Sequence, residues 1–459
     1  MKDKHNSLKL FHEYNSYIMD KANSGIEQNR KDYFSIKICD KNEVPINNAK
    51  VTAVLKNHEF KFGANLKELD RNESEKNNQN YRDNFNRLFN LANISLNWDD
   101  AEPKDGDFHY EKTGMDCLPS IGECMEYCEK NNIEPRLQAL ASEGAFPKWL
   151  YGADSNEVKN KLSKRIYEIS QRYSQKARSV EAIRGMFGYD DNVGFYNDNE
   201  YVTWCLKETE KYMPANQIVI NEFSHVWYDG LGINRDRYYM EIEDLLSKNA
   251  RIDAIGMEFR MFMSAREQFL DSMRVHMYVG WWPDEMETYR KAYDPTHLFK
   301  TINKYSDFNR PLHITGVMIP AYTSNPKDEE IQAELLKYLY LIWFSQKNVE
   351  QIVYWNIVDG FEGELTEKED SLYGGLLRRD LSKKPAFYVL DSLINKEWRT
   401  EETFLTNEDG VGRFKGFYGE YELTIEIGNK KFTKSVEFNK EREISLCSIF
   451  GKEHQQIII

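Results

Sequence analysis

Residues 312–358 read LHITGVMIPAYTSNPKDEEIQAELLKYLYLIWFSQKNVEQIVYWNIV. Two short runs rich in β-branched and aromatic residues, Leu312–Ile319 and Gln351–Val358, flank a long amphipathic stretch, Asp328–Gln346. Buried parallel strands are near-continuous apolar runs, and they are joined by helices that cross over the sheet. The segment therefore predicts one complete β–α–β unit.

The same alternation extends over residues 59–398. Strands are expected at Phe60–Leu66, Leu91–Trp98, Pro135–Ala141, Ile183–Tyr189, Gln217–Phe223, Ile252–Phe259, Leu312–Ile319 and Gln351–Val358. Eight strands separated by helical stretches fit a closed (β/α)8 TIM barrel of the α/β class better than an open doubly wound sheet. No GxGxxG or P-loop motif follows the first strand, so the commonest nucleotide-binding alternative is excluded.

Both ends of the chain have a different pattern. Residues 1–30 read as a polar helical segment, whereas residues 31–58 and 399–459 alternate with a period of two, which is typical of strands. Near the C-terminus, a Gly428-Asn429 pair between two such runs predicts a hairpin. We expect residues 31–58 and 399–459 to form one small accessory β-sandwich beside the barrel of residues 59–398.

Composition excludes several classes of protein. The 459 residues are 41% hydrophobic and 30% charged, which is incompatible with a largely disordered chain. No apolar run of about 18 residues predicts a membrane span, and a net charge of −14 argues against nucleic acid or an anionic membrane as partner. The first residues lack the apolar core of a signal peptide, so a cytoplasmic location is expected, with secretion the alternative if a signal was removed.

The six cysteines include no CxxC pair, and no two histidines have ligand spacing, so neither a metal nor a cofactor is expected. The sequence makes no prediction about oligomeric state.

Functional groups of a (β/α)8 barrel lie at the C-terminal ends of its strands. Candidate catalytic carboxylates at these ends are Glu143, Asp190, Asp191, Glu222 and Glu258. Candidate substrate-binding residues are Asn97, Trp98, Trp149, Tyr189, Asn221, Arg260, Trp281, Trp282, Trp355 and Asp359. Paired carboxyl groups serve as acid and nucleophile or base at a glycosidic bond, and aromatic rings stack on sugars. The residues at this mouth therefore favour a carbohydrate substrate.

Short motifs occur in a fixed order along the chain. They are Phe60-Lys61-Phe62-Gly63-Ala64, Asn97-Trp98 with Glu102-Pro103, Pro147-Lys148-Trp149, Ile220-Asn221-Glu222-Phe223, Ile252-Asp253-Ala254-Ile255-Gly256-Met257, His313-Ile314-Thr315, and Trp355 with Lys384-Pro385-Ala386-Phe387. In order and spacing they resemble glycoside hydrolase family 10, the endo-xylanase family, over residues 45–395. The resemblance implies a barrel that hydrolyses polysaccharide without a cofactor.

The catalytic positions depart from the family pattern. The family motif at the end of the fourth strand, aligned with residues 186–191, places Asp191 on the general acid/base Glu, with Asp190 one residue away. The family nucleophile on the seventh strand is replaced by Gly316. New carboxylates appear instead at Glu143 and Glu258.

Two functions follow from these departures. In the first, the chain is a glycoside hydrolase with relocated chemistry, acting on an oligosaccharide or glycoside that is not ordinary xylan. Asp191 is then the acid, and Glu258, Glu222 or Glu143 the nucleophile or base. In the second, the chain is a pseudo-enzyme that binds glycans without cleaving them.

Two further features bear on the ligand. Arg260 is expected to keep Glu258 ionised or to bind an acidic sugar such as a uronate. The insertion Met261–Tyr293 carries Trp281-Trp282 and is expected either to form a lid or extra subsite or to pack on the barrel.

Overall fold

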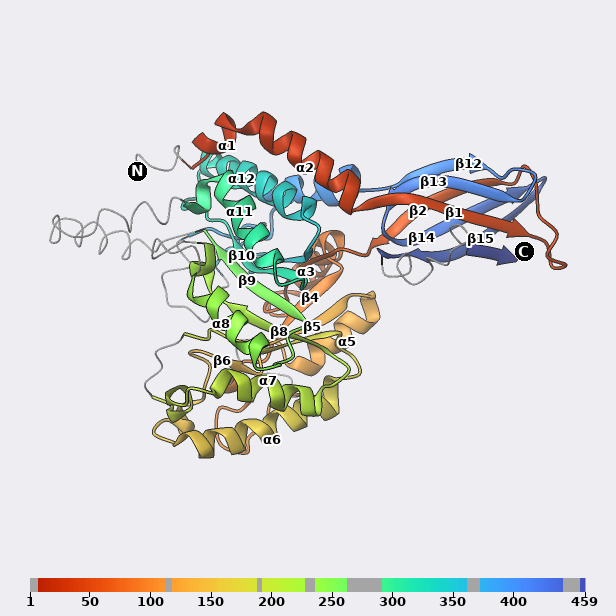
Figure 1. The fold of residues 1–459 in the computed structure, drawn as a ribbon. Helices are drawn as coiled ribbons and strands as arrows, with labels where there is room; N and C mark the ends of the chain where they lie inside the picture. Colours follow the sequence, from red (N-terminus) through yellow and green to blue (C-terminus); the bar gives the residue numbers. More distant parts are fainter. Residues whose placement is uncertain are drawn as a thin grey trace. The chain divides into compact units, whose positions relative to one another are not determined.

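The computed structural model describes residues 7–111, 118–187, 192–227, 236–261, 291–360, 372–440 and 455–458. The chain divides into two compact units (Figure 1). The barrel unit comprises Met1–Ile18, Phe62–Trp343 and Asn348–Val389. The second unit comprises Met19–Lys61, Phe344–Lys347 and Leu390–Ile459.

The barrel unit is built on one parallel sheet. Its strands are β3 (Lys61–Asn65), β4 (Leu91–Ser95), β5 (Glu134–Gln138), β6 (Ala141–Ser142), β7 (Ser179–Arg184), β8 (Gln217–Glu222), β9 (Ala254–Arg260), β10 (Leu312–Met318) and β11 (Val349–Tyr354). Hydrogen bonding runs in the order β5-β4-β3-β11-β10-β9-β8-β7-β6, and a further pairing of β5 with β7 closes the sheet. The short β6 continues the position of β5, so the barrel has eight strand positions, and the predicted TIM barrel is confirmed.

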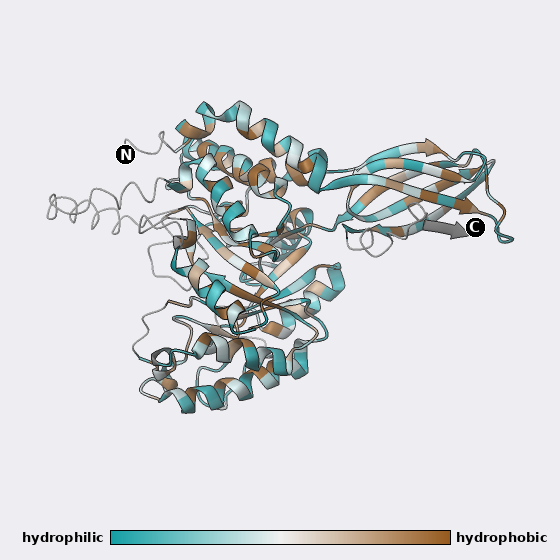
Figure 2. Cartoon of the chain, viewed as in Figure 1, coloured by the Kyte–Doolittle hydropathy of each residue, from teal (hydrophilic) through white to brown (hydrophobic). Residues whose placement is uncertain are grey.

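Helices alternate with these strands and lie around them (Figure 1). They are α3 (Glu75–Leu88), α5 (Ile121–Asn131), α6 (Ser155–Tyr173), α7 (Tyr201–Tyr212), α8 (Arg237–Ser247), α11 (Pro295–Ser306), α12 (Pro326–Ser345) and α13 (Pro385–Ser392), with short α1 (Lys9–Glu13) and α4 (Trp98–Ala101). Single turns of 3-10 helix occur at Lys148–Leu150, Gly194–Asn197, Ser224–Trp227 and Lys291–Tyr293, and a π-helical turn at Leu393–Glu397. Figure 2 shows hydrophobic residues gathered on the barrel strands and hydrophilic residues on the outer helix faces.

The helix starts are fixed by the local sequence. Ser74, Ser120, Asp154, Asp236 and Asp294 precede α3, α5, α6, α8 and α11, and each side chain accepts a hydrogen bond from a backbone N–H of the first turn. Those N–H groups have no partner within the helix, so a polar cap stabilises each start, typically by about 1 kcal/mol.

The expected fourth strand, Ile183–Tyr189, was wrong, because β7 spans Ser179–Arg184. The apolar residues after Ile183 suggested a later strand, whereas the true strand contains the charged residue Glu181. Arg136 on β5 forms a buried ion pair with Glu181, which makes that carboxylate compatible with the barrel interior.

Smaller differences have local causes. The expected strand Leu91–Trp98 stops at Ser95 because Trp98 begins α4. The expected Pro135–Ala141 is divided into β5 and β6, and β11 ends at Tyr354, before the predicted Val358. The predicted helical segment 1–30 contains two helices, α1 and α2 (Asn15–Asn29).

The second unit holds two sheets built from both ends of the chain. Its strands are β1 (Lys31–Cys39), β2 (Lys50–His58), β12 (Glu401–Leu405), β13 (Val411–Phe417), β14 (Gly419–Ile427), β15 (Lys430–Phe438) and β16 (Gln455–Ile458). One sheet has the order β13-β1-β16 and the other β12-β2-β14-β15. Phe34 of β1 stacks on Phe438 of β15 with ring centroids 4.3 Å apart, so aromatic side chains join the two sheets. The predicted sandwich and its β14–β15 hairpin are confirmed.

Candidate functional site

A polar layer fills the barrel interior below the mouth. Arg136 Nη1 donates a hydrogen bond of 2.6 Å to Asn93 Oδ1, and its Nη2 pairs with Glu181, while Asn93 also bonds Asn65 and Gln138. Arg136 and Glu181 are completely buried. Burial raises the pKa of Glu181, although Arg136 opposes that rise. These side chains hydrogen-bond to one another, so the layer forms a structural floor for the mouth.

Glu258 lies above this floor, near the end of β9. Its Oε1 accepts a hydrogen bond of 2.5 Å from Arg184 Nε, and its Oε2 lies 3.5 Å from Arg260 Nε. Burial raises the pKa of Glu258, but the two arginines outweigh burial and hold that pKa below its usual range. Arg184, and after it Arg260, thus favour the charged form of Glu258.

Two glycines stand beside the candidate carboxylates. Gly316 on β10 has φ +54°, and a Cβ there would lie 3.3 Å from Cγ and Cδ of Glu258. Gly185, directly after β7, has φ +74°, and a Cβ there would lie 3.0 Å from Cβ of Glu143 and 2.6 Å from the Phe223 ring. Neither position accepts a side chain without strain, because L-residues rarely adopt this backbone conformation.

The corrected end of β7 changes the motif alignment. The family motif closes its strand with the acid/base Glu, and in this structure the strand closes with Arg184 followed by Gly185. The predicted acid Asp191, with Asp190 and Tyr189, lies outside the described residues. Arg184 was missed because the predicted strand ended five residues too late, at Tyr189; the pairing of Arg184 with Asn221 of β8 marks the true end.

Asn221 and Glu222 point to opposite sides of β8. Asn221 Oδ1 accepts a hydrogen bond of 2.8 Å from Thr315 of β10, which places Asn221 inside the barrel. Successive side chains of a strand alternate, so Glu222 faces the helix layer. Its carboxylate accepts hydrogen bonds from the backbone N–H groups of Met186 (2.6 Å) and Phe223 (2.9 Å). Burial raises the pKa of Glu222 to about 7, against the lowering effect of these N–H donors.

Trp355, directly after β11, is surrounded by cations. Arg260 lies 4.3 Å, Lys67 4.6 Å and Arg184 5.7 Å from the centroid of its ring. The side chain is only 4% exposed. The ring predicted to stack on a sugar therefore carries cationic side chains, an arrangement favoured by the negative face of the indole.

Asp359 forms an ion pair and a hydrogen bond within the fold. It forms a buried ion pair with Lys384, with an Oδ1 to Nζ distance of 3.2 Å, and accepts a hydrogen bond of 2.7 Å from Gly375 N. Burial raises the pKa of Asp359 and lowers that of Lys384. Asp359, which was predicted to contact substrate, thus forms an internal ion pair that holds the chain segment after β11.

Trp98 and Trp149, both predicted to bind substrate, each donate a hydrogen bond to Glu102. Trp98 Nε1 donates to Glu102 Oε2 at 2.7 Å, and Trp149 Nε1 donates to the Glu102 carbonyl at 2.8 Å. Their rings meet edge to face, 5.9 Å apart, with Trp98 buried and Trp149 partly exposed. Trp281 and Trp282 lie outside the described residues.

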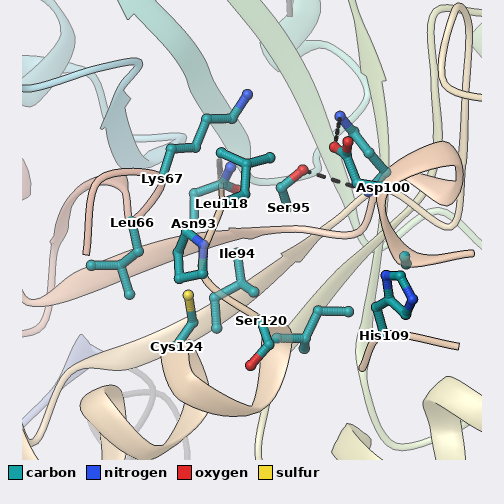
Figure 3. A pocket seen from close by; sticks show the side chains of 14 residues that line it. Leu66, Lys67, Asn93, Ile94, Ser95, Asp100, His109, Leu118, Ser120 and Cys124 are labelled. Atoms are coloured by element: carbon teal, nitrogen blue, oxygen red, sulfur yellow. Dashed lines mark hydrogen bonds between the residues drawn. The ribbon is translucent and has the colours of Figure 1, made fainter. Parts of the chain in front are cut away.

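A cavity of about 260 Å³ opens beside the ends of β3 and β4 (Figure 3). Its polar lining is Lys67, Asn93, Ser95, Asn97, Asp100, His109 and Ser120, and its apolar lining includes Leu66, Ile94, Leu118 and Ile121. Asn97 Nδ2 donates to Asp100 Oδ2 at 3.2 Å. Lys67 both lines this cavity and lies over Trp355, so it links the two parts of the mouth. Of these polar residues, only Asn97 was predicted to bind substrate.

The family comparison agrees with this architecture. The model for glycosyl hydrolase family 10 matches residues 50–392. The chain belongs to glycosyl hydrolase family 10. Among solved structures, the family 10 fold is shared with xylanase 10B from Thermotoga maritima, at a TM-score of 0.56 and 16% identity, covering 74% of this chain and 96% of that one.

Two curated relatives match this chain over less than half of their own length. Anti-sigma-I factor RsgI6 of Acetivibrio thermocellus is 25% identical over 431 residues, which are 92% of this chain and 48% of the relative. Endo-1,4-beta-xylanase 3 of Arabidopsis thaliana is 20% identical over 376 residues, which are 77% of this chain and 41% of the relative. The chain therefore spans about half the length of the curated relatives it matches, or less.

The described part of the chain contains no group of three or more His, Cys, Asp or Glu side chains arranged to hold a metal ion. It also contains no helix that is long and apolar enough to cross a membrane.

Proposed function

We propose that this family 10 barrel binds a carbohydrate at its mouth rather than cleaving it. The observation that carries the proposal is the strand end on β10. Gly316 occupies the position where the family resemblance places the nucleophile, and it supplies no carboxylate. Glu258, the carboxylate beside Gly316, is completely buried and held by two arginines. A nucleophile must reach the anomeric carbon, so this placement favours binding over hydrolysis.

The cavity beside β3 and β4 is the proposed place for a sugar. Its volume of about 260 Å³ is slightly below the roughly 300 Å³ at which ligand pockets usually begin, so it suits a single sugar unit. Lys67, Asn97, Asp100 and His109 supply donors and acceptors for hydroxyl groups, and the rest of the lining includes apolar side chains. The similarity to a protein named as an anti-sigma factor also supports a binding role, because it links this architecture to a protein named for regulation.

Calorimetric titration with a panel of monosaccharides and oligosaccharides tests the proposal. We expect saturable binding, weakened about tenfold by Asn97→Ala, the size of effect that one lost hydrogen bond produces. Asn160→Ala on the exposed face of α6 is the matched control and should bind like the wild type. Absence of binding across the panel at millimolar sugar would refute the proposal.

Hydrolysis is the second candidate function, because Glu258 lies beside Gly316 and Glu143 lies beside Gly185. Arg184 and Arg260 lower the pKa of Glu258, which favours the ionised form that a nucleophile requires, and Glu143 lies against Gly185 at the end of β7. In a retaining reaction Glu258 would attack the anomeric carbon, and Glu143 would protonate the leaving oxygen. The substrate would be a glycoside other than ordinary xylan, since the residues of the family site are replaced.

Release of sugar from aryl glycosides and oligosaccharides separates the two functions. Turnover by the wild type that is lost in both Glu258→Gln and Glu143→Gln would establish the relocated pair. Sugar binding without turnover by the wild type would leave the binding function as the correct one.

A further inference from the structure

The cavity beside β3 and β4 has two chemically different ends. Figure 3 shows Leu66, Ile94 and Cys124 on one side of the cavity, with Asp100 and His109 on the other. The first three side chains are buried, and together they form what we call the apolar end. They come from the residue after β3, from β4 and from α5, so the packing of this helix beside the strands creates the apolar end.

The apolar end offers a ligand little hydrogen bonding. Leu66 and Ile94 carry only hydrocarbon side chains, and the Cys124 thiol is a weak donor and a weak acceptor. Burial raises the pKa of this thiol well above its usual value, so Cys124 presents a neutral S–H group. A methyl group therefore suits this end better than a hydroxyl group does.

Three further polar residues of the lining contact other parts of the barrel unit. Asn93 Oδ1 accepts a hydrogen bond of 2.6 Å from Arg136, and Ser120 caps the first turn of α5. The Lys67 ammonium group lies 4.6 Å from the centroid of the Trp355 ring. A ligand hydroxyl buried among Leu66, Ile94 and Cys124 would thus exchange its hydrogen bonds with water for apolar contacts, which is costly.

We propose that the sugar bound in this cavity is a 6-deoxyhexose, whose C6 methyl group lies at the apolar end. The inference rests on the proposed carbohydrate binding and names its ligand class. The ring hydroxyl groups then face the other end, where Asn97, Asp100 and His109 line the cavity. Amide and carboxylate groups form several hydrogen bonds at once, so the contact between Asn97 and Asp100 is compatible with a bound sugar.

An ordinary hexose and a pentose each match the cavity less well. The C6 hydroxyl of a hexose would be buried among hydrocarbon side chains without a strong hydrogen-bond partner. A pentose has no C6, so the apolar end would stay unfilled and the burial of one carbon would be lost. The volume of about 260 Å³ suits a single sugar unit of any of these classes, so the chemistry of the apolar end, rather than its size, discriminates among them.

Calorimetric titration with sugars that differ only at C6 tests the inference. The pairs are L-fucose with L-galactose, D-fucose with D-galactose, L-rhamnose with L-mannose, and 6-deoxy-D-glucose with D-glucose. In the pair whose ring hydroxyl groups fit the polar lining, we expect the 6-deoxy sugar to bind about tenfold more tightly than its partner. We also expect it to bind about fourfold more tightly than the pentose of the same ring configuration, because one more methyl group is buried.

Cys124→Ser and Cys128→Ser are matched variants of one helix. Cys124 is among the described residues that line the cavity, whereas Cys128, one turn later in α5, is buried but is not among them. Cys124→Ser brings a hydroxyl group to the apolar end, so the preference for the 6-deoxy sugar should fall to about threefold or less. Cys128→Ser should keep the full preference. Cys124→Ala stays apolar and should keep it too, which gives a second test if serine destabilises the fold.

Equal affinities within every pair, or a preference that Cys124→Ser leaves unchanged, would overturn the inference while carbohydrate binding stands. Loss of the preference in Cys128→Ser as well would also overturn it, because the effect would then arise in the helix and not in the cavity. Binding of other carbohydrates but of none of the 6-deoxy sugars would overturn it in the same way. Absence of binding by every sugar would instead refute the proposed function and the inference with it.

Discussion

Replacing Gly316 with alanine should destabilise the barrel more than the same change at another left-handed glycine. Gly316 has φ +54°, and a left-handed conformation costs an L-residue about 1–2 kcal/mol. The added Cβ would also lie 3.3 Å from Cγ and Cδ of Glu258. Glu258 cannot yield freely, since Arg184 holds it at 2.5 Å, so an overpacking cost of about 1–3 kcal/mol is added. We therefore expect Gly316→Ala to lower the free energy of unfolding by about 3 kcal/mol.

Gly106→Ala is the matched control. Gly106 has φ +81° in a barrel-unit loop, and a Cβ there would meet no atom within 4 Å, so this variant bears the backbone cost alone. Urea unfolding followed by tryptophan fluorescence measures both variants. If Gly316→Ala is no more destabilising than Gly106→Ala, Glu258 is not held rigidly against Gly316, and the expected overpacking cost is refuted.

Three other predictions concern buried charges. Arg136→Met should lower the free energy of unfolding by about 3–5 kcal/mol, because it leaves Glu181 buried without its partner; urea titration should show that adding Glu181→Met recovers part of the loss. The raised pKa of Glu222, about 7, means that its contribution to stability is lost as pH rises through about 7; Glu222→Gln should flatten the fall in unfolding free energy between pH 5 and 8, and an unchanged slope would contradict this. The lowered pKa of Glu258 gives the opposite sign, with stability lost as pH falls through its folded value; Glu258→Gln should flatten acid unfolding followed by circular dichroism, and an unaltered acid slope would show that Glu258 is not the group responsible.

The local sequence pattern predicted most of the helices and strands, and the strands it misplaced have identifiable physical causes. Near-continuous apolar runs located β8 and β10 to within one residue, because a strand buried on both faces has few alternatives. The same rule misplaced the fourth strand, since Glu181 is an interior residue whose burial depends on Arg136, 45 positions away in the chain. No local pattern reveals such a pair.

The barrel and the accessory sandwich could be predicted from the sequence alone, because hydrophobic periodicity is a local property. Contacts between distant parts of the chain place Trp355 among three cations, pair Asp359 with Lys384, and turn Glu222 away from the barrel interior. These outcomes depend on which strand ends become neighbours and on the face toward which each side chain points. Closure of the sheet sets both, since a shift of one residue in a strand sends its side chain to the opposite face.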